Sequence, residues 1–381
     1  MKVELAIPCI YDSAMDFSEG LALVLHNEKW GYIDKNNNVV ISSAYGGLGH
    51  FSEGLAPVIH NGKHGFIDKS GNIVINCVYD SARGFSEGLA PVVLNGKWGF
   101  IDKSGNEVIK CMYNYTFNFH DGLARVQIDE KYDPEKEYSP AEIYGFEKYG
   151  YIDKSGNEVI KCAYNEDELG KFSEGLVSVM RNGDFGFIDK GGNEVISFAY
   201  YYAGCFSEGL APVILNKSQK WGFIDKSGNM AINCVYDRVH HFSEGLAAVR
   251  PNGKYGYGKW GFIDKSGNEI IKCVYAYENY EGPELFSEGL ACVNVDGKYG
   301  LIDKNGNEIV KCMYDLIPRF SEGLAAVRLN GKWGYIDTKG NEIIKCVYVD
   351  DKVFMTPRPF SEGMACVNLD RKYGFLAKIE E

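Results

Sequence analysis

One phrase, repeated ten times, constrains this chain more than any other feature. Phe-Ser-Glu-Gly or a close variant recurs along the 381 residues and starts at Phe17, Phe51, Phe85, Phe119, Phe172, Phe206, Phe242, Phe286, Phe320 and Phe360. An aromatic–glycine pair recurs in step, and from Gly31 to Gly65 the step is 34 residues. Periods of 20–50 residues are typical of stacked repeat architectures. We therefore predict that residues 1–381 form a single array of about ten units, with an insertion at 129–147 in the fourth.

A regular copy predicts three antiparallel strands. Residues 85–118 read FSEGLAPVVLNGKWGFIDKSGNEVIKCMYNYTFN. The β-type run 89–94 is followed by Asn95-Gly96, a strong two-residue hairpin signal, and then by a second strand at 97–102. The segment Asp-Lys-Ser-Gly-Asn fits a turn with glycine in the left-handed position, and 107–113 is a third strand rich in Val and Ile. Each copy is expected to be an all-β, three-stranded meander.

The copies must stack, because both faces of the predicted strands carry apolar residues and one unit is too small to bury them alone. The chain ends are out of phase with the repeat. LAIPCIYD near the start resembles a third strand, and the last copy ends after its second strand. We expect an open solenoid or superhelix, because the 34-residue unit is short for a propeller blade and ten exceeds the usual blade number. The alternative is a closed ring or propeller-like toroid, in which the N-terminal strand completes the last unit.

The phrases KWGFIDKSGNEVI and FSEGLA, with a trailing YD, closely resemble those of the WG-repeat family, a group of bacterial tandem-repeat proteins. The resemblance covers essentially all ten units. It departs in the fourth copy, which reads FHDG, at His64 in place of the aromatic, and in the truncated last copy. It implies a β-repeat protein and no catalytic residues.

Composition narrows the class of partner and the compartment. The formal net charge is −12, and no Lys/Arg-rich run is present, which argues against nucleic acid as a direct partner. No stretch has the length and apolarity of a membrane span, and the N-terminus lacks the features of a secretion signal. We expect a cytoplasmic protein whose 11 cysteines are reduced thiols.

The residues that recur in every copy have structural explanations. Eight cysteines occupy one position of the third strand without the close spacing of a metal site. The Asp-Lys-Ser-Gly-Asn segment has too few acidic ligands for calcium. The FSEG glutamates are expected to form a ladder with the lysine of the KWG phrase. Gly84–Gly88 matches G-x-S-x-G, but no strand-to-helix turn is predicted there. We predict no enzyme activity, no catalytic, cofactor-binding or metal residues, and no cofactor.

Two functions remain open. The first is a protein-interaction scaffold with a repetitive aromatic and acidic surface that binds a protein or peptide. Its candidate contact residues lie in the insertion of the fourth copy and are Tyr132, Tyr138, Tyr144 and Phe146. The second is a carbohydrate or cell-surface binder, since tandem aromatic hairpins also suit stacking against sugars. Burial of the tryptophans of the WG phrase would remove the main residues of the second interpretation.

Overall fold

The computed structural model describes residues 2–42, 45–129, 147–215, 219–251, 258–275, 282–317, 319–349, 358–369 and 371–379. The candidate contact residues of the insertion lie outside these ranges. The chain divides into two compact units, each described by itself. Unit one comprises Met1–Tyr11, Arg181–Phe187 and Val195–Glu381, and unit two comprises Asp12–Met180 and Ile188–Glu194. The regular elements of the described residues are β-strands, apart from one short 3-10 helix, η1 (Glu166–Glu168).

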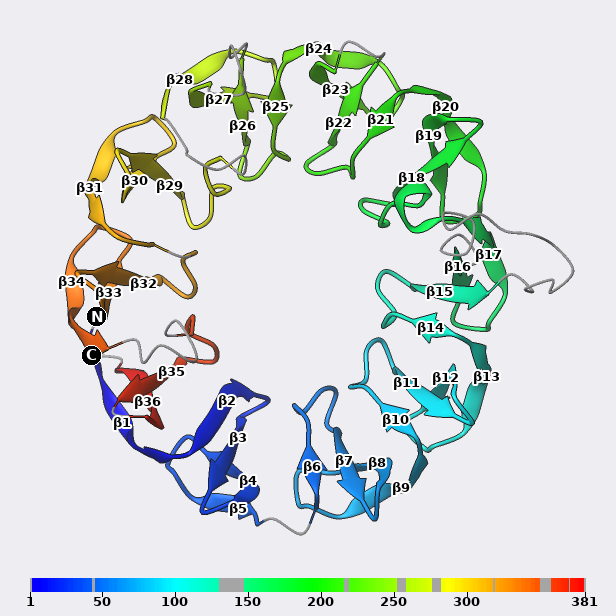
Figure 1. Ribbon diagram of the computed structural model, residues 1–381, viewed down its shortest axis with the longest axis vertical. Coiled ribbons are helices and arrows are strands. Elements are labelled where there is room, and N and C mark those ends of the chain that lie inside the picture. Colours follow the sequence, from blue (N-terminus) through cyan, green and yellow to red (C-terminus); the bar gives the residue numbers. More distant parts are fainter. Residues whose placement is uncertain are drawn as a thin grey trace, which may run out of the picture. The chain divides into compact units, whose positions relative to one another are not determined.

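Unit two contains four-stranded antiparallel sheets in which strands pair in chain order (Figure 1). These sheets are β2 (Ser13–Ser18), β3 (Leu21–His26), β4 (Lys29–Asp34) and β5 (Val39–Ile41); β6 (Gly47–Leu48), β7 (Ala56–His60), β8 (Lys63–Ile67) and β9 (Ile73–Tyr79); β10 (Ser81–Ala82), β11 (Leu89–Leu94), β12 (Lys97–Asp102) and β13 (Glu107–Tyr113); and β14 (Tyr115–Thr116), β15 (Leu123–Asp129), β16 (Glu147–Asp153) and β17 (Glu158–Tyr164). A further sheet, whose residues are divided between the two units, contains β18 (Leu176–Arg181), β19 (Asp184–Asp189) and β20 (Glu194–Tyr200).

Unit one repeats the same design. Its four-stranded sheets are β21 (Tyr202–Ala203), β22 (Leu210–Ile214), β23 (Trp221–Asp225) and β24 (Met230–Tyr236); and β25 (Arg238–Val239), β26 (Leu246–Arg250), β27 (Trp260–Asp264) and β28 (Glu269–Tyr275). Its three-stranded sheets are β29 (Leu290–Val295), β30 (Lys298–Asp303) and β31 (Glu308–Tyr314); β32 (Leu324–Leu329), β33 (Lys332–Asp337) and β34 (Glu342–Val349); and β1 (Lys2–Tyr11), β36 (Lys372–Ile379) and β35 (Met364–Leu369).

The predicted three-stranded meander is present in every sheet, and six of the ten sheets have a fourth strand that the sequence analysis did not predict. In the third copy this strand is β10, only two residues long, where Ser81 pairs with Val93 and Ala82 with Val92. The segment between one meander and the next FSEG phrase therefore returns alongside the first long strand. It satisfies backbone groups that an irregular connection would leave unpaired.

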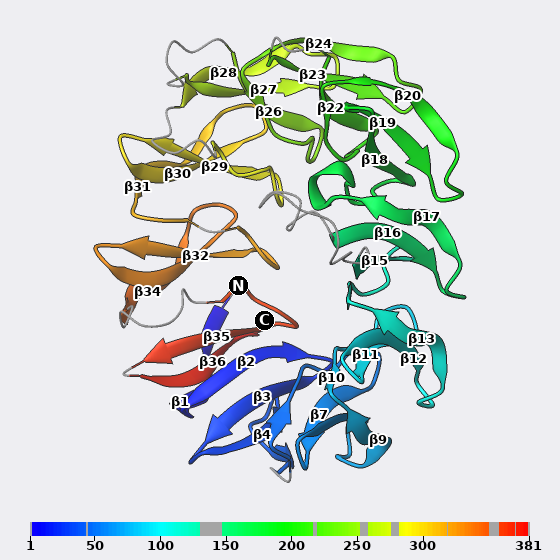
Figure 2. The same ribbon diagram turned by 45° about the vertical axis from the view of Figure 1, so that its right-hand side comes forward.

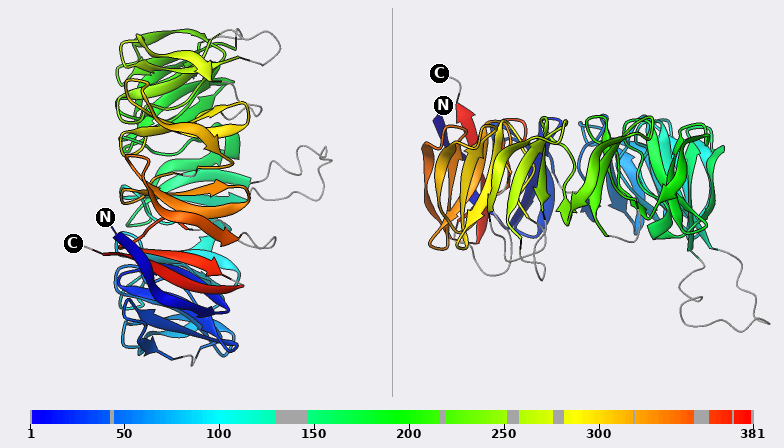
Figure 3. Two further views of the ribbon diagram at one scale, coloured as in Figure 1. Left: turned by 90° about the vertical axis from the view of Figure 1, so that its left-hand side faces the viewer. Right: turned by 90° about the horizontal axis from the view of Figure 1, so that it is seen from above.

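The first strand of the chain completes the last sheet. β1 pairs antiparallel with β36, from Lys2 opposite Ile379 to Tyr11 opposite Tyr373. Figure 2 shows the blue β1 beside the red β36, and Figure 3 shows the two chain ends emerging close together. The last copy thus obtains its third strand from the start of the chain. This is the pairing named in the alternative to the open array.

Backbone geometry explains the two recurring turns. Asn95 and Gly96 have φ angles of 52° and 73°, as a type I′ hairpin turn requires. In the longer turn the side chain of Asp102 accepts hydrogen bonds from the backbone N–H of Ser104 and of Asn106, both at 2.9 Å. Gly105 lies in the left-handed region with φ of 83°. The turns predicted from the sequence are confirmed.

The glycine of the WG pair allows the third strand to bulge. Trp98 lies opposite Tyr113, and Phe100 lies opposite Ile109. A step of two residues along β12 therefore corresponds to a step of four residues along β13. A Cβ at Gly99 would lie 2.5 Å from the backbone oxygen of Ile109 and 2.6 Å from the backbone nitrogen of Cys111. No side chain fits there. The close backbone approach expected at this glycine is therefore present.

The core lies between successive sheets, as the two apolar faces predicted. One cluster combines Leu55, Phe66 and Ile75 of the second copy with Phe85, Ala90, Val92 and Ile101 of the third. The FSEG phenylalanine is part of this core, because the rings of Phe66 and Phe85 lie 5.0 Å apart between centroids. The serine that follows adds a polar link, since the hydroxyl of Ser86 donates to the carbonyl of Phe119 in the next copy at 2.7 Å. Stacking is thus fixed by a buried ring and a hydrogen bond.

Candidate functional site

Exposed apolar side chains recur on the third strands of both units. In β13, Val108 and Met112 are 42% and 56% exposed. Together, such side chains form what we call the apolar row: Val40, Val74, Val78, Val108 and Met112 in unit two, and Ile10, Val195, Val235, Ile270, Val274, Ile309, Met313 and Val347 in unit one. An isolated exposed valine needs no explanation, whereas recurrence at the same positions of many copies makes these side chains a candidate interaction surface. This row was not predicted from the sequence, because alternation alone does not show which apolar face is covered.

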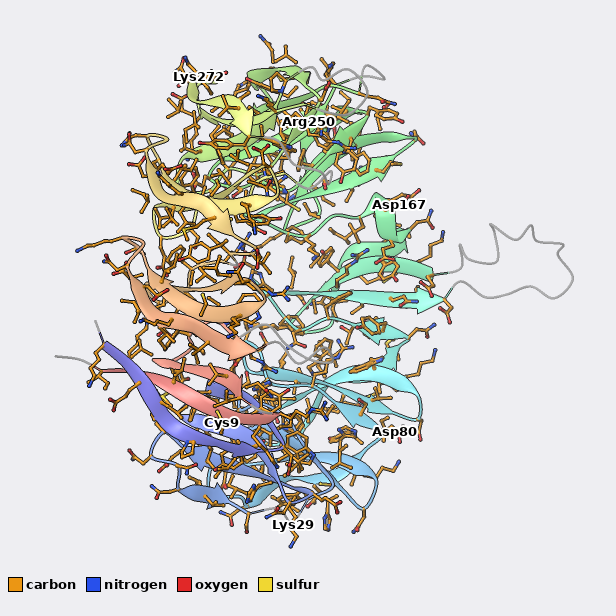
Figure 4. The ribbon with its side chains drawn as sticks, turned by 60° about the vertical axis from the view of Figure 1, so that its left-hand side comes forward. Cys9, Lys29, Asp80, Asp167, Arg250 and Lys272 are labelled. Atoms are coloured by element: carbon orange, nitrogen blue, oxygen red, sulfur yellow. The ribbon has the colours of Figure 1, made fainter. Side chains whose placement is uncertain are left out.

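The apolar row lies on an edge of each sheet. β13 is the last strand in the order β10–β11–β12–β13. This strand contains the bulge, where the N–H of Cys111 donates to the Glu107 carboxylate at 3.0 Å. Because a bulge interrupts the regular row of backbone groups, this edge is unsuitable for adding a further strand. In some copies an exposed lysine separates the two apolar positions, as Lys110 does in β13 and Lys272, labelled in Figure 4, does in β28, whereas Asn76 stands there in β9. The row therefore presents apolar and cationic side chains to a partner, rather than unpaired backbone hydrogen-bonding groups.

The FSEG glutamates form a ladder, but with a different lysine from the one predicted. The carboxylate of Glu53 accepts the N–H of Gly88 in the next copy at 3.0 Å and pairs with Lys103 at 3.0 Å. Lys103 belongs to the Asp-Lys-Ser-Gly-Asn turn. The KWG lysine instead contacts the residue after the third strand of its own sheet, as Lys63 does with Asp80 at 2.6 Å. The prediction erred because the offset between stacked sheets decides which lysine lies within reach.

The ladder glutamates lie in a tight two-residue turn, closed by hydrogen bonds between the backbones of Ser52 and Leu55, in which both central residues have positive φ. Glu53 has a φ of 54°, in the left-handed region that non-glycine residues rarely adopt, and nine other FSEG-type copies have an acidic residue in the same conformation. The conformation lets the carboxylate link two copies. Its partners are an N–H and an ammonium group of the next copy, so the row of carboxylates is structural.

The aspartates of the Asp-Lys-Ser-Gly-Asn turns accept hydrogen bonds from within their own turns. Hydrogen bonds from the side chain and backbone of Asn106, and from the backbone of Ser104 and Gly105, hold the pKa of Asp102 below its usual range. Its carboxylate oxygens are therefore already engaged. Among the residues that the structure describes, there is no group of three or more His, Cys, Asp or Glu side chains placed to hold a metal ion.

The cysteines of the third strand are poor nucleophiles. All eleven cysteines of the chain are free thiols. Burial, followed by the nearby Glu107 carboxylate, raises the pKa of Cys111 to about 11. Burial, followed by the nearby Glu158 carboxylate, raises the pKa of Cys162 to about 12. The thiolate is the reactive form, and these thiols hold very little of it near neutral pH.

The tryptophans of the WG phrase are committed to internal contacts. Trp260 and Trp333 are buried, and Trp30, Trp98 and Trp221 are half-buried. The guanidinium of Arg83 lies 4.3 Å from the ring centroid of Trp98, and the ring of Tyr202 lies 5.2 Å from that of Trp221. Rings that already stack on protein groups leave little aromatic surface against which a sugar could stack.

A cavity of about 320 Å³ lies between the fourth and fifth copies in unit two. It is lined by Phe117, Asn118, His120, Leu123, Arg125, Tyr151, Lys171 and Phe172. The same eight repeat positions between the eighth and ninth copies enclose a cavity of only about 10 Å³. The FHDG variant that contains His120 is visible in the sequence, but no cavity was predicted there. The additional signal was Arg125, which occupies a position where Pro91 stands in the third copy.

Comparison with known proteins establishes the family. The model of the WG containing repeat matches residues 4–30, 30–63, 65–98, 98–132, 149–183, 185–217, 221–255, 260–299, 299–333 and 333–373. The chain therefore belongs to the WG containing repeat family, as the sequence resemblance indicated. No curated protein matches the sequence significantly.

Solved structures are similar only at a coarse level. The computationally designed Ika8 protein aligns over 80% of this chain and 95% of its own, at 12% identity and a TM-score of 0.33. A eukaryotic initiation factor aligns over 80% and 88%, at 12% identity and a TM-score of 0.45. The extracellular domain of a putative hybrid two-component system from B. thetaiotaomicron aligns over 93% and 54%, at 10% identity and a TM-score of 0.26.

In the described residues, no helix has the length and apolarity needed to cross a membrane.

Proposed function

We propose that the chain is a non-enzymatic interaction scaffold that binds a protein or peptide partner through the apolar row. The observation that carries this proposal is the repeated exposure of Val, Ile and Met at the same positions of successive third strands, illustrated by Val78 at 52% and Met112 at 56%. Burial of such side chains contributes roughly 25 cal/mol for each Å² of apolar surface removed from water. Several copies in contact at once would sum small contributions into a specific interface.

Charge indicates what kind of partner fits. Exposed lysines lie beside the apolar positions on the third strands, as Lys110, Lys272 and Lys311 do, although the chain as a whole has a formal charge of −12. A partner with an apolar strip flanked by carboxylates would match both features. Electrostatic complementarity of this kind mainly affects the association rate and specificity.

Two observations weaken other interpretations. The raised pKa values of the third-strand thiols and the hydrogen-bonded turn carboxylates remove the recurring groups best suited to catalysis. The internal stacking of Trp98 and Trp221 weakens the carbohydrate interpretation, which depended on exposed rings. The insertion residues Tyr132, Tyr138, Tyr144 and Phe146 stay a separate prediction, because they lie outside the described residues.

The test replaces the row without disturbing the core. Val78→Ser combined with Met112→Ser removes two exposed members of the row in unit two, and the proteins captured from the source lysate are compared with those of the unaltered chain. The matched control is Leu94→Ser, at a side chain that is 37% exposed in the hairpin between β11 and β12. We expect the double variant to lose partners that the control retains. Identical partner sets for all three proteins would refute the role of the row.

A further inference from the structure

We propose that the cavity between the fourth and fifth copies binds a small organic carboxylate that carries a flat or branched apolar group. Its volume of about 320 Å³ falls at the lower end of the range of about 300–1,000 Å³ found for small-molecule pockets. It lies entirely in unit two and uses none of the third-strand side chains of the apolar row. The proposal is therefore independent of the scaffold function.

The lining favours a negative charge. Arg125 and Lys171 are cationic, and none of the eight lining residues is acidic. The equivalent cavity of the eighth copy differs in this respect. There Arg319, at the position of Lys171, pairs with Glu284 at 3.3 Å. In the fourth copy Phe117 stands at the position of that glutamate, so the lining itself contributes no carboxylate.

The cationic group is held in place before any ligand arrives. The guanidinium of Arg125 lies 4.3 Å from the ring centroid of Tyr149, and its Nη2 donates to the backbone carbonyl of Glu166 at 3.1 Å. These contacts fix the long side chain and so reduce the conformational entropy that binding would otherwise remove. Because a planar guanidinium presents several donors, it matches the geometry of a carboxylate.

The apolar part of the lining favours a ring or a branched chain. Phe117, Tyr151 and Phe172 contribute aromatic surface, and Leu123 contributes aliphatic surface. The hydroxyl of Tyr151 is already used, since it donates to the carbonyl of Gly170 at 2.9 Å. Its ring is therefore fixed in orientation. A rigid apolar wall beside a fixed cation suits an amphipathic anion better than a bare inorganic one.

Six of the eight lining positions differ between this copy and the eighth. Phe117, His120 and Arg125 stand where the eighth copy has Glu284, Ser287 and Cys292. The serine position matters for stability, because in six other copies its hydroxyl donates to the phenylalanine carbonyl of the next copy. The fourth copy therefore lacks a stabilising link of its neighbours and has a cationic cavity in its place.

The experiment measures binding to the full chain by calorimetry and ligand-observed NMR. The probes are benzoate, phenylacetate and 4-methylpentanoate, with acetate testing the charge alone and 2-phenylethanol testing the ring alone. We expect at least one of the first three to bind at least about tenfold more tightly than either control, since charge-assisted hydrogen bonds and apolar burial then act together. If none of the three binds, or if acetate binds equally well, the proposal is wrong.

Variants locate the site. Arg125→Gln and, separately, Phe117→Glu should each weaken binding by about tenfold or more, the first by removing the cation and the second by adding a carboxylate at an exposed position. Arg319→Gln is the matched control in the equivalent cavity and should leave affinity unchanged. Circular dichroism checks that each variant is folded. Unchanged affinity in both cavity variants, or an equal loss in the control, would overturn the assignment.

Discussion

The fourth and eighth copies use the same repeat positions in opposite ways. In the eighth, Glu284 and Arg319 pair across a cavity of about 10 Å³. In the fourth, Phe117 and His120 replace Glu284 and Ser287, and the cavity measures about 320 Å³. The meander of strands is the same in both. The comparison teaches that a repeat protein can specialise one copy by side-chain changes at the contact between copies, because the strands and turns are stabilised by other residues.

The largest expected effect tests whether the fourth copy retains an intact core beside its cavity. Phe119 is 1% exposed and lies 4.7 Å from the ring of Phe100, while Phe286 is 2% exposed and lies 5.0 Å from that of Phe262. Phe119→Ala and Phe286→Ala should each lower the free energy of unfolding by about 3–5 kcal/mol. Phe117→Ala, at a 42% exposed side chain, should change it by less than about 0.5 kcal/mol.

Urea unfolding followed by circular dichroism provides the measurement. If Phe119→Ala had as small an effect as Phe117→Ala, the fourth copy would be loosely packed throughout. The cavity would then reflect general loosening rather than local specialisation.

Acid should weaken both regions alike. Hydrogen bonds from Asn157 lower the pKa of Asp153 in the fourth copy, and those from Asn307 lower the pKa of Asp303 in the eighth, both from an ordinary value of 3.8. A carboxyl whose pKa is lower in the folded state contributes stability above its unfolded pKa and loses it as the pH falls through the folded value. The midpoint of thermal unfolding should therefore be steady near neutral pH and fall below about pH 4.

Single substitutions test whether the turn carboxylates cause this loss of stability. Asp153→Asn and Asp303→Asn should each flatten the acid limb by a similar amount, since both turns have the same geometry. A melting temperature that did not change between pH 6 and pH 3 would contradict the role of the turn carboxylates.

A smaller effect concerns the missing serine of the fourth copy. Ser321 donates its hydroxyl hydrogen to the carbonyl of Phe360 at 2.7 Å, and Ser321→Ala should lower the free energy of unfolding by about 1 kcal/mol. His120→Ser should raise it by a similar amount, because the new hydroxyl can donate to Phe172. If His120→Ser instead destabilised the chain, the histidine would have a structural role that the comparison does not assign to it.

The smallest effect concerns the glutamate ladder, which is altered at both copies for different reasons. In the fourth copy the acidic residue is the shorter Asp121, whose Oδ2 lies 3.7 Å from Nζ of Lys190. In the eighth copy the acidic residue is Glu288, but the ninth copy has Thr338 where the pairing lysine would stand. Asp121→Glu and Thr338→Lys should each raise the free energy of unfolding by up to about 0.5 kcal/mol, as for partly exposed ion pairs. High salt should remove the gain. A gain that persists at high salt would argue against an ionic cause.

Local features were predictable from the sequence because they depend on residues close together in the chain. The Asn95-Gly96 hairpin, the turn at Asp102 and the need for glycine at Gly99 follow from backbone geometry within one copy. The stacking core was also predictable, since apolar residues on both faces of a small sheet require neighbours. Repetition supports these predictions, because the same residues occupy the same places in nearly every copy.

The features that depend on contacts between copies were decided only by the tertiary structure. The pairing of Lys103 rather than Lys97 with Glu53 depends on the offset between stacked sheets, which no pattern within one copy records. The return of β1 to β36 joins residues from opposite ends of the sequence. The exposed apolar row and the cavity beside Arg125 likewise depend on which surfaces the neighbouring copies leave uncovered. The sequence by itself therefore determined the repeating unit and its turns, and packing between units determined its surfaces, because side-chain reach is set only after the sheets are stacked.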